Sequence, residues 1–179
     1  LTTEKPDMEN IRILLMTSGF KSLFHSKITV SCDSAAILEY GSEKNKTTYS
    51  APAGEAITIE SGDPRLSKGR MSFRPTDEGG LIRVESIERA QGIPVYPGHV
   101  EITAEENGLL LLNEVNLEEY LKRVIPSEMP STYEIEALKA QAICARTYAW
   151  KQIQGNTYSA YGAHVDDSTN FQVYNNTGT

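Results

Sequence analysis

The chain has 179 residues, of which 39% are hydrophobic and 23% charged, and its formal net charge at pH 7 is -7. This length suits one folded domain, alone or with a small appendage, and the composition is that of an ordinary globular protein. The negative charge argues against nucleic acid as the main partner, because phosphate binding needs a basic face. No apolar run approaches the roughly 20 residues of a membrane-spanning helix.

The sequence begins at Leu1 without a signal peptide, so we expect a mature fragment whose targeting segment has been removed. The two cysteines, Cys32 and Cys144, match no metal-binding or redox spacing. We expect each to pack as a small buried side chain, and a disulfide between them is the less favoured alternative.

Residues 1–10 are polar and predict a loose lead-in. From Ile11 to about Leu112 the pattern is that of short strands. The run IRILLM at residues 11–16 is typical of a strand buried on both faces. One-sided strands are indicated by alternation in KITVSC, EAITIE, RMSFR and LIRVESI. HVEIT and LLLLNEV flank Asn107 and Gly108, a pair preferred in two-residue hairpin turns that need positive φ.

At Asn116 the period changes from that of strands to that of helices. Asn116 and Glu119 form a capping pair, and apolar residues then recur at helical spacing up to Ile125. We therefore predict a short helix that Pro126 ends.

A second capping pair, Ser131 and Glu134, precedes a longer helix that we predict from about Thr132 to Gln154, with Gly155 as its stop. Residues 156–179 are expected to be loop-like, with one short strand at 171–174. The fold class is therefore α+β, with a strand-rich region at about 11–112 packed against a helical core at about 117–154 and a loop-rich C-terminal segment.

The longer helix carries two cations where only apolar residues are expected. Lys139 and Arg146 lie within about 40° and 20° of Ile135 on a helical count. Their apolar stripe consists of Ile135, Leu138, Ala142, Ala149 and Ile153. Buried unpaired cations are costly, so both should face inward to an anion or a wet cleft. The alternative is that both extend past the core with their charged ends in solvent.

Glu128 stands between Pro126 and Pro130, which fix their own φ and push Ile125 and Met129 toward extended geometry. We therefore predict a stiff elbow between the two helices, with an apolar surround. Such a surround raises the pKa of a carboxyl group, which suits a general acid working near neutral pH. Alternatively, the glutamate only caps the following helix, favoured by its dipole. Composition and spacing leave both readings open.

The segment NLEEYLKRVIPSEMPSTYEIEALKAQAICARTYAW, residues 116–150, resembles the central motif of the stage II sporulation protein D family (SpoIID/LytB). The shared elements are LEEYL, PSEMP, ALKAQA and ARTYA. Three flanking stretches, IRILLMTSGF, KITVS and DDSTNFQVY, are similar to that family more loosely.

The resemblance implies a peptidoglycan lytic transglycosylase that remodels the cell wall during engulfment in spore formation. Such an enzyme cleaves the β-1,4 bond between N-acetylmuramic acid and N-acetylglucosamine and leaves a 1,6-anhydro product. The resemblance makes Glu128 the catalytic acid. It makes the following residues candidates for substrate binding: Lys139, Gln141, Arg146, Tyr148, Gln172 and Tyr174.

The resemblance also divides the chain into a lead-in at 1–10, a β-rich region at 11–112 and a helical catalytic core at 113–179. In the family the chain continues past the Q-V-Y element, so we expect part of the groove to lie beyond Thr179.

Two other functions remain open on the sequence alone. A lysozyme-like hydrolase would need a second carboxylate about 5 to 9.5 Å from the first, and the candidates are Asp166 and Asp167. Glu134 and Glu136 are better explained as first-turn helix charges. The other alternative is a non-catalytic module that binds glycan or enhances an amidase. Aromatic side chains that can stack on sugars in either case are Tyr148, Tyr158, Tyr161 and Tyr174.

Members of the family often carry a cysteine before the Q-V-Y element, and some bind zinc there. Here that position is Phe171 and only His164 lies nearby, so we predict no metal, and no cofactor. The partners implied by the resemblance are peptidoglycan glycan strands, a peptidoglycan amidase and membrane proteins of the engulfment machinery. The implied location is extracytoplasmic, in the intermembrane space of the sporulating cell, with an anchor outside this sequence.

Overall fold

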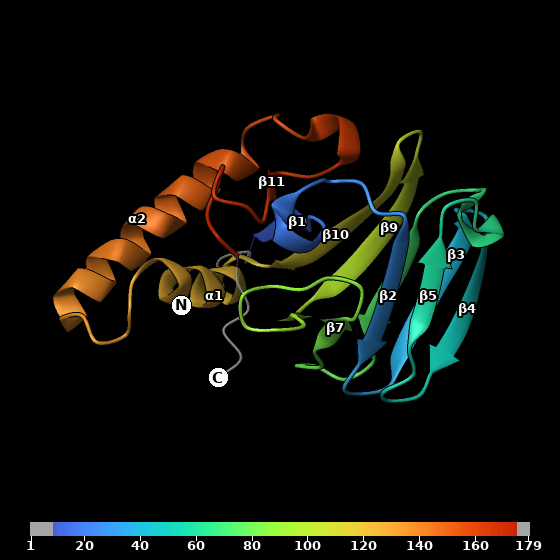
Figure 1. Ribbon diagram of the computed structural model, residues 1–179, viewed down its shortest axis with the longest axis horizontal. Coiled ribbons are helices and arrows are strands. Elements are labelled where there is room, and N and C mark those ends of the chain that lie inside the picture. The colour runs from blue at the N-terminus through green and yellow to red at the C-terminus, as the bar shows by residue number, and fades with distance from the viewer. Residues whose placement is uncertain (1–8, 175–179) are drawn as a thin grey trace, which may run out of the picture.

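The computed structural model describes residues 9–174 as two sheets and two α-helices (Figure 1). The larger sheet has seven strands in the order β11-β1-β10-β9-β6-β3-β4, and the smaller has four in the order β5-β2-β7-β8. Most strands precede the helices along the chain, which confirms the predicted α+β class. The expectations for residues 1–8 and 175–179 lie outside the described residues.

The strands are β1 (Asn10–Leu14), β2 (Lys27–Cys32), β3 (Ala36–Ser42), β4 (Asn45–Ala51), β5 (Ile57–Glu60), β6 (Met71–Pro75), β7 (Ile82–Val84), β8 (Val95–Tyr96), β9 (His99–Glu105), β10 (Gly108–Asn116) and β11 (Val165–Asp166). The α-helices are α1 (Leu117–Glu128) and α2 (Ile135–Ile153). Three short 3-10 helices are η1 (Ser18–Phe20), η2 (Pro64–Leu66) and η3 (Ser159–Tyr161).

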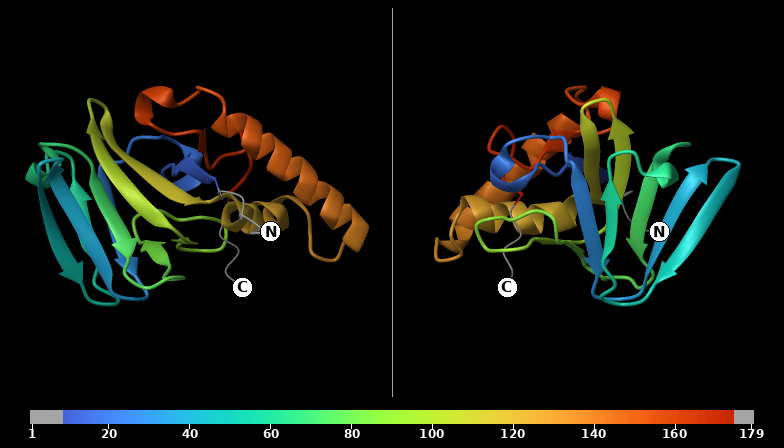
Figure 2. Two further views of the ribbon diagram at one scale, coloured as in Figure 1. Left: turned by 180° about the vertical axis from the view of Figure 1, so that it is seen from behind. Right: turned by 45° about the vertical axis from the view of Figure 1, so that its right-hand side comes forward.

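The two sheets enclose one hydrophobic core, and Figure 2 shows them facing each other at the end of the molecule away from α2. Val30 and Ile82 come to this core from the smaller sheet, while Phe73 and Val100 come from the larger one. The alternation predicted for KITVSC is confirmed, because Ile28, Val30 and Cys32 are all buried. Burial of one face per strand therefore holds the sheets together.

The β9–β10 hairpin forms where it was predicted, with its turn one residue earlier. Gly108 already pairs with Glu105, so the two loop residues are Glu106 and Asn107. Gly108 has φ 138°, and a Cβ there would approach the carbonyl oxygen of His25 to 3.0 Å. Glycine is required at this position for its backbone angle and for the close approach of the neighbouring chain.

Helix α1 continues through Pro126 to Glu128, so the predicted stop at Pro126 is wrong. A proline so near the helix end removes one backbone hydrogen bond, and the last turn still closes because Met129 N donates to Ile125 O at 2.9 Å. Met129 is extended, as expected before a proline, whereas Ile125 is helical. Glu128 is thus the last helical residue and not part of a separate elbow.

Asn116 caps α1 as predicted, since its side-chain oxygen accepts from Glu118 N at 2.9 Å. The second predicted cap is wrong. Helix α2 begins only at Ile135, and Glu134 stands at its N-cap without a side-chain capping bond. Residues 171–174 form no strand, so that prediction is wrong. The strand that follows α2 is β11, and it pairs in parallel with β1.

The inward face of α2 is lined by small residues. Ala145 and Ala149 are 2% and 1% exposed, which allows the helix to pack closely on its neighbours. Of the predicted inward stripe, Ala149 is buried and Leu138, Ala142 and Ile153 are half-buried, whereas Ile135 at its start is 66% exposed. Ile143 and Trp150, which lie outside that stripe, are 61% and 46% exposed. Lys139 and Arg146 lie on this outer side and are exposed, so the prediction that they face inward is wrong.

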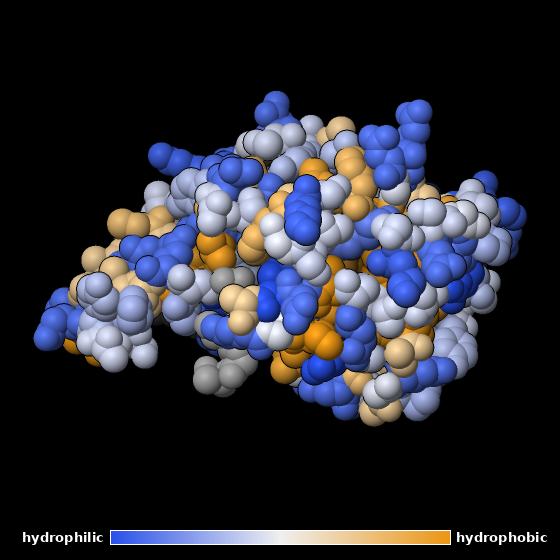
Figure 3. Space-filling view, viewed as in Figure 1, coloured by the Kyte–Doolittle hydropathy of each residue, from blue (hydrophilic) through white to orange (hydrophobic). Residues whose placement is uncertain are grey.

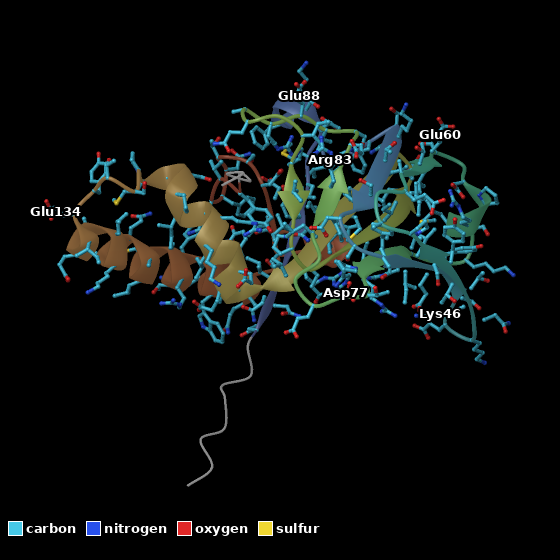
Figure 4. All side chains as sticks on the ribbon, turned by 90° about the horizontal axis from the view of Figure 1, so that it is seen from below. Lys46, Glu60, Asp77, Arg83, Glu88 and Glu134 are labelled. Carbon is cyan, nitrogen blue, oxygen red and sulfur yellow. The ribbon has the colours of Figure 1, made fainter. Side chains whose placement is uncertain are left out.

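Figure 3 shows apolar side chains among hydrophilic ones along α2, and Figure 4 shows Glu134 at the end of the molecule remote from the sheets. Among the described helices, none combines the length and the apolar character needed to cross a membrane.

An ion pair on the outer side joins α2 to α1. Arg146 Nε and Nη2 donate to the two carboxylate oxygens of Glu118 at 2.8 and 2.9 Å. These hydrogen bonds from Arg146 hold the pKa of Glu118 below its usual value. The contact is bidentate but exposed, so it fixes the angle between the helices more than it stabilises the fold.

Substituting Glu118→Gln and Arg146→Gln, singly and together, should reveal a coupling free energy of about 0.5 kcal/mol, as is usual for exposed pairs. Because the folded-state pKa of Glu118 lies below its unfolded value, this stabilisation is present above the unfolded pKa and lost as the pH falls through the folded one. Urea unfolding of the four proteins at about pH 7 and about pH 3 checks this sign. Equal coupling at both pH values would contradict it.

A buried ion pair ties the C-terminal segment to the rest of the fold. The side chains of Arg89 and Asp167 are 2% and 0% exposed, and Arg89 Nη2 donates to Asp167 Oδ2. Asp167 Oδ1 also accepts from Met16 N at 3.0 Å, and Asp167 N donates to Leu14 O. Burial raises the pKa of Asp167 to about 6, and the charge of Arg89 opposes that rise.

We expect Asp167→Ala to lower the free energy of unfolding by about 3 to 5 kcal/mol, because it leaves the buried Arg89 guanidinium without its partner. Denaturant unfolding at about pH 7.5, above the pKa of Asp167, measures the loss. The matched control is Asp77→Ala at an exposed loop position (Figure 4), which should change stability by less than about 0.5 kcal/mol. Similar losses in the two variants would refute an anchoring role for the pair.

Candidate functional site

The end of α1, the middle of α2 and the loop after β11 meet around an open cavity of about 370 Å³. Glu128 comes from the last residue of α1 and Gln141 and Tyr148 come from α2. The remaining lining residues are Cys144, Ala145, Thr169, Asn170, Phe171 and Gln172. Three segments that are separate in the sequence therefore build one cleft.

Gln141 holds the carboxylate of Glu128. Its Nε2 donates to Glu128 Oε2 at 2.8 Å, a charge-assisted hydrogen bond when Glu128 is ionised. The Glu128 side chain is exposed, so the apolar surround expected from its proline neighbours is absent. Gln141 was predicted to bind substrate, and its contact in the structure is with the candidate acid.

Gln172 lines the cleft, but its side-chain amide forms hydrogen bonds with other residues of the protein. Its Nε2 donates to the carbonyl oxygen of Ala145 at 3.1 Å, and its Oε1 accepts from Tyr120 at 3.4 Å. These bonds hold the loop after β11 against α2, so Gln172 shapes the wall of the cleft.

Tyr174 is fully buried and lies outside the cleft, which differs from the substrate-binding role predicted for it. Its ring packs between Tyr96 and Tyr120 at centroid distances of 5.4 and 5.0 Å, and its hydroxyl donates to Asn113. Tyr148 is the aromatic residue of the predicted set that lines the cleft, and it is 36% exposed. Its ring is thus available to a ligand.

Tyr158 and Tyr161 pack on each other and do not line the cleft, although Tyr158 also packs on Phe171, which does. Neither Lys139 nor Arg146 is among the described residues that line the cleft. Lys139 Nζ pairs with Glu136 one turn away at 3.0 Å, and Arg146 pairs with Glu118. The predicted approach of these two cations to Glu128 is therefore not seen.

Neither candidate for a second carboxylate reaches the cleft. Asp166 and Asp167 are 2% and 0% exposed. Asp166 accepts hydrogen bonds from Tyr158 and Ser168, and Asp167 is paired with Arg89. Among the described residues that line the cleft, Glu128 is the only one with a carboxylate.

His164 is not free for a metal, since its Nδ1 accepts from Arg12 N at 3.0 Å. Elsewhere, His99, Glu101 and Glu114 bring one possible ligand atom each within 4.8 Å of one another. Both carboxylates of that group already contact the Arg12 guanidinium, at 2.6 and 3.0 Å. Their negative charge is matched by a side chain, and we propose no metal there.

Five residues of the cleft lining were not predicted as site residues from the sequence: Cys144, Ala145, Thr169, Asn170 and Phe171. Thr169 and Asn170 lie in DDSTNFQVY, so the loose similarity of that stretch was the available signal. Cys144 was expected to be buried but is exposed in the cleft, whereas Cys32 is buried as predicted; both thiols are free. The small neighbours of Cys144 gave no indication of which side of the helix it faces.

Comparison with known proteins addresses the same part of the chain. The model of the SpoIID family, described as a stage II sporulation protein, matches residues 105–179, which include Glu128 and every residue of the cleft lining. This segment is similar to the SpoIID family. The family resemblance read from the PSEMP and ARTYA elements is thereby confirmed.

Individual relatives match the chain over similar lengths. An uncharacterized protein of Brachyspira hyodysenteriae is 38% identical over 98 residues, 55% of this chain and 26% of its own. Stage II sporulation protein D of Bacillus subtilis is 36% identical over 110 residues, 60% of this chain and 28% of its own.

The amidase enhancer of Bacillus subtilis is 48% identical over 54 residues, 30% of this chain and 6% of its own. The matched part of this chain thus corresponds to about a quarter of the length of the first two relatives. No solved structure matches.

The exposed thiol of Cys144 offers a direct probe of the SpoIID cleft. Treating the folded protein with a maleimide should label Cys144 and spare Cys32, giving one adduct by mass spectrometry. If the cleft holds the glycan that is proposed below as its ligand, the adduct should weaken glycan binding roughly tenfold or more. A Cys144→Ser protein given the same treatment should bind as before. Unchanged binding after complete labelling would contradict the position of the cleft.

Proposed function

We propose that this chain carries the catalytic part of a peptidoglycan lytic transglycosylase that remodels the cell wall during sporulation. The observation that carries the proposal is the cleft itself, in which one carboxylate, Glu128, stands beside a polar wall and an accessible aromatic ring. Similarity to the SpoIID family and the names of the relatives support the setting in sporulation.

In the proposed reaction Glu128 begins as the acid and donates its proton to the glycosidic oxygen. The bond from C1 of N-acetylmuramic acid to that oxygen then breaks, and N-acetylglucosamine leaves with a hydroxyl. The 6-hydroxyl of the muramic acid attacks its own C1, and its proton passes to the Glu128 carboxylate. The product has a 1,6-anhydro ring, and the acid is restored without consuming water.

A single carboxylate suffices for this reaction because the nucleophile belongs to the substrate. Hydrolysis by two carboxylates needs a second group about 5 to 9.5 Å away to act on water or on the sugar. The burial of Asp166 and Asp167 disfavours that alternative. The transglycosylase is therefore the better fit to the cleft.

Other residues would orient the acid and the sugar. Gln141 fixes one oxygen of Glu128 and leaves the other to face the scissile bond. Tyr148 can stack on the apolar face of a sugar ring, and Thr169 and Asn170 can bind its hydroxyls. Arg146 would act from outside the cleft, by holding α2 to α1 through Glu118.

A second candidate is a non-catalytic module that binds glycan and enhances an amidase. The similarity to a protein named amidase enhancer favours it. In that case the same cleft would hold the glycan without cleaving it. A site that only binds glycan does not require a carboxylate positioned by a hydrogen bond, as Glu128 is by Gln141. The enzyme is therefore the first choice.

The proposal extends to the partners and the location of the protein. We propose that it acts outside the cytoplasm, anchored to the membrane through another segment, beside a peptidoglycan amidase that removes stem peptides. Membrane proteins of the engulfment machinery would hold it near its glycan.

The proposal predicts that Glu128→Gln reduces cleavage of purified glycan strands by about 10² to 10⁴-fold, the usual effect of losing a general acid. Stability and glycan binding should stay close to those of the parent protein. The matched control is Glu136→Gln, at an exposed glutamate of α2 that pairs only with Lys139 among the described residues. A Glu128→Gln protein with more than about a tenth of the parent rate would rule out the assignment on that scale.

Mass spectrometry of the same digests identifies the product. Anhydro ends, one water lighter than hydrolysis products, are expected. Free reducing ends would make the protein a hydrolase. Glycan binding without cleavage of any strand would favour the amidase-enhancing module.

A further inference from the structure

A second pocket, of about 320 Å³, lies in the β-rich part of the chain, outside the segment that matches the SpoIID family. It opens between β4, an edge strand of the larger sheet, and β5, an edge strand of the smaller one. Lys46 on β4 and Glu60 on β5 lie at the end of the molecule opposite Glu134 at the start of α2 (Figure 4). This pocket is therefore separate from the cleft at Glu128.

The pocket combines an apolar floor with accessible aromatic rings. Leu38 and Ile57 on its floor are 1% and 8% exposed. Tyr40 is half-buried, and Tyr49 is 45% exposed although its side chain is large and partly apolar. The C–H face of a sugar ring is the usual partner of such a surface, because it is apolar and flat while the hydroxyls around it remain hydrated.

Two charged groups of opposite sign stand at the same pocket, each held by other parts of the protein. The Tyr49 hydroxyl lies 2.8 and 3.0 Å from the two oxygens of Glu55, to which it donates. Arg65 donates from Nε and Nη2 to Asp63, and from Nη2 to the carbonyl oxygen of Thr58. The carboxylate keeps further acceptor sites, and the guanidinium has five N–H donors in all.

We infer that this pocket is a second saccharide-binding site, one that takes a neutral amino-sugar unit of a glycan. Tyr49 and Tyr40 would hold the ring, Glu55 would accept from its hydroxyls, and Arg65 would donate to its oxygens. The inference rests on the proposed function insofar as that function supplies a glycan as ligand. It adds a binding point at the far end of the molecule from the acid.

The lining favours a neutral saccharide over a charged peptide. Glu55 and Arg65 have opposite charges, so the two groups attract neither a net anion nor a net cation strongly. Both are already oriented by Tyr49 and Asp63, so binding would cost little side-chain ordering. A glycan strand held here would keep the protein on the cell wall while the cleft engages another part of it.

The test is a titration of the ¹⁵N-labelled chain with the tetramer of N-acetylglucosamine, followed by backbone amide shifts. Amides of Tyr49 and Thr58 report this pocket, and amides of Gln141 and Gln172 report the cleft. A parallel titration uses the stem tetrapeptide of peptidoglycan. Tyr49→Ala should weaken saccharide binding at this pocket about tenfold, and Tyr49→Phe, which keeps the ring, should lose less. Tyr133→Ala, at another exposed tyrosine, is the matched control.

Saccharide-dependent shifts at Tyr49 and Thr58 that Tyr49→Ala removes, in a protein whose other amides are unchanged, support the site. Shifts confined to Gln141 and Gln172 would overturn this inference and leave the proposed function intact. Shifts at Tyr49 and Thr58 without any at the cleft would support this site and count against the function proposed for Glu128. Shifts at this pocket with the peptide alone would replace the saccharide by a peptide and overturn the inference.

Discussion

The buried pair of Arg89 and Asp167 is the contact on which the arrangement of the cleft depends. It joins the loop after β7 to the segment that carries Thr169 to Gln172, and Met16 N adds a further bond to the same carboxylate. A buried charge pair contributes little net stability over an apolar one, but breaking it is costly. The pair therefore acts as a specific connection, which places the loop after β11 where Gln172 can meet α2.

Further contacts then hold α2 and α1 in place around the cleft. Gln172 bonds to the backbone of α2 at Ala145, and small side chains on that face allow close approach. The ion pair of Glu118 and Arg146 sets α2 against α1 from the outer side. With both helices fixed, Gln141 meets the carboxylate of Glu128. The position of the Glu128 carboxylate thus depends on contacts among three separate segments.

Local features of the fold could be predicted from the sequence, whereas the face of α2 that points inward could be predicted only in part. Alternation in KITVSC correctly identified β2, because a period of two is decisive when one face is buried. Pro126 misled because a proline in the final turn removes only one hydrogen bond, too little to end the helix. On α2 the predicted stripe included the buried Ala149 but also the exposed Ile135, and it missed the buried Ala145, because an alanine gives only a weak hydrophobic signal.

The same limit applies to the site. Glu128 and Gln141 were predicted as site residues from one long motif, and the structure places the two side chains in contact. Tyr174 was misassigned because an aromatic residue in a polar stretch reads as accessible, whereas pairing across the chain with Tyr96 and Tyr120 buries it. Whether such a residue is exposed or buried depends on contacts between distant segments, which a local sequence pattern does not reveal.

The pairing of β1 with both β10 and β11 has a consequence for how the protein can be made and divided. Residues near the two ends of the described chain must meet before the cleft has a wall, so the site depends on contacts that are far apart in the sequence. The family match begins at residue 105, but a fragment cut there would lose β1 and Arg89 together. It would also lose nearly all of β9, so both edges of β10 would be unpaired and open to association with other chains. The segment that matches the family model therefore depends on earlier strands of this chain for its packing.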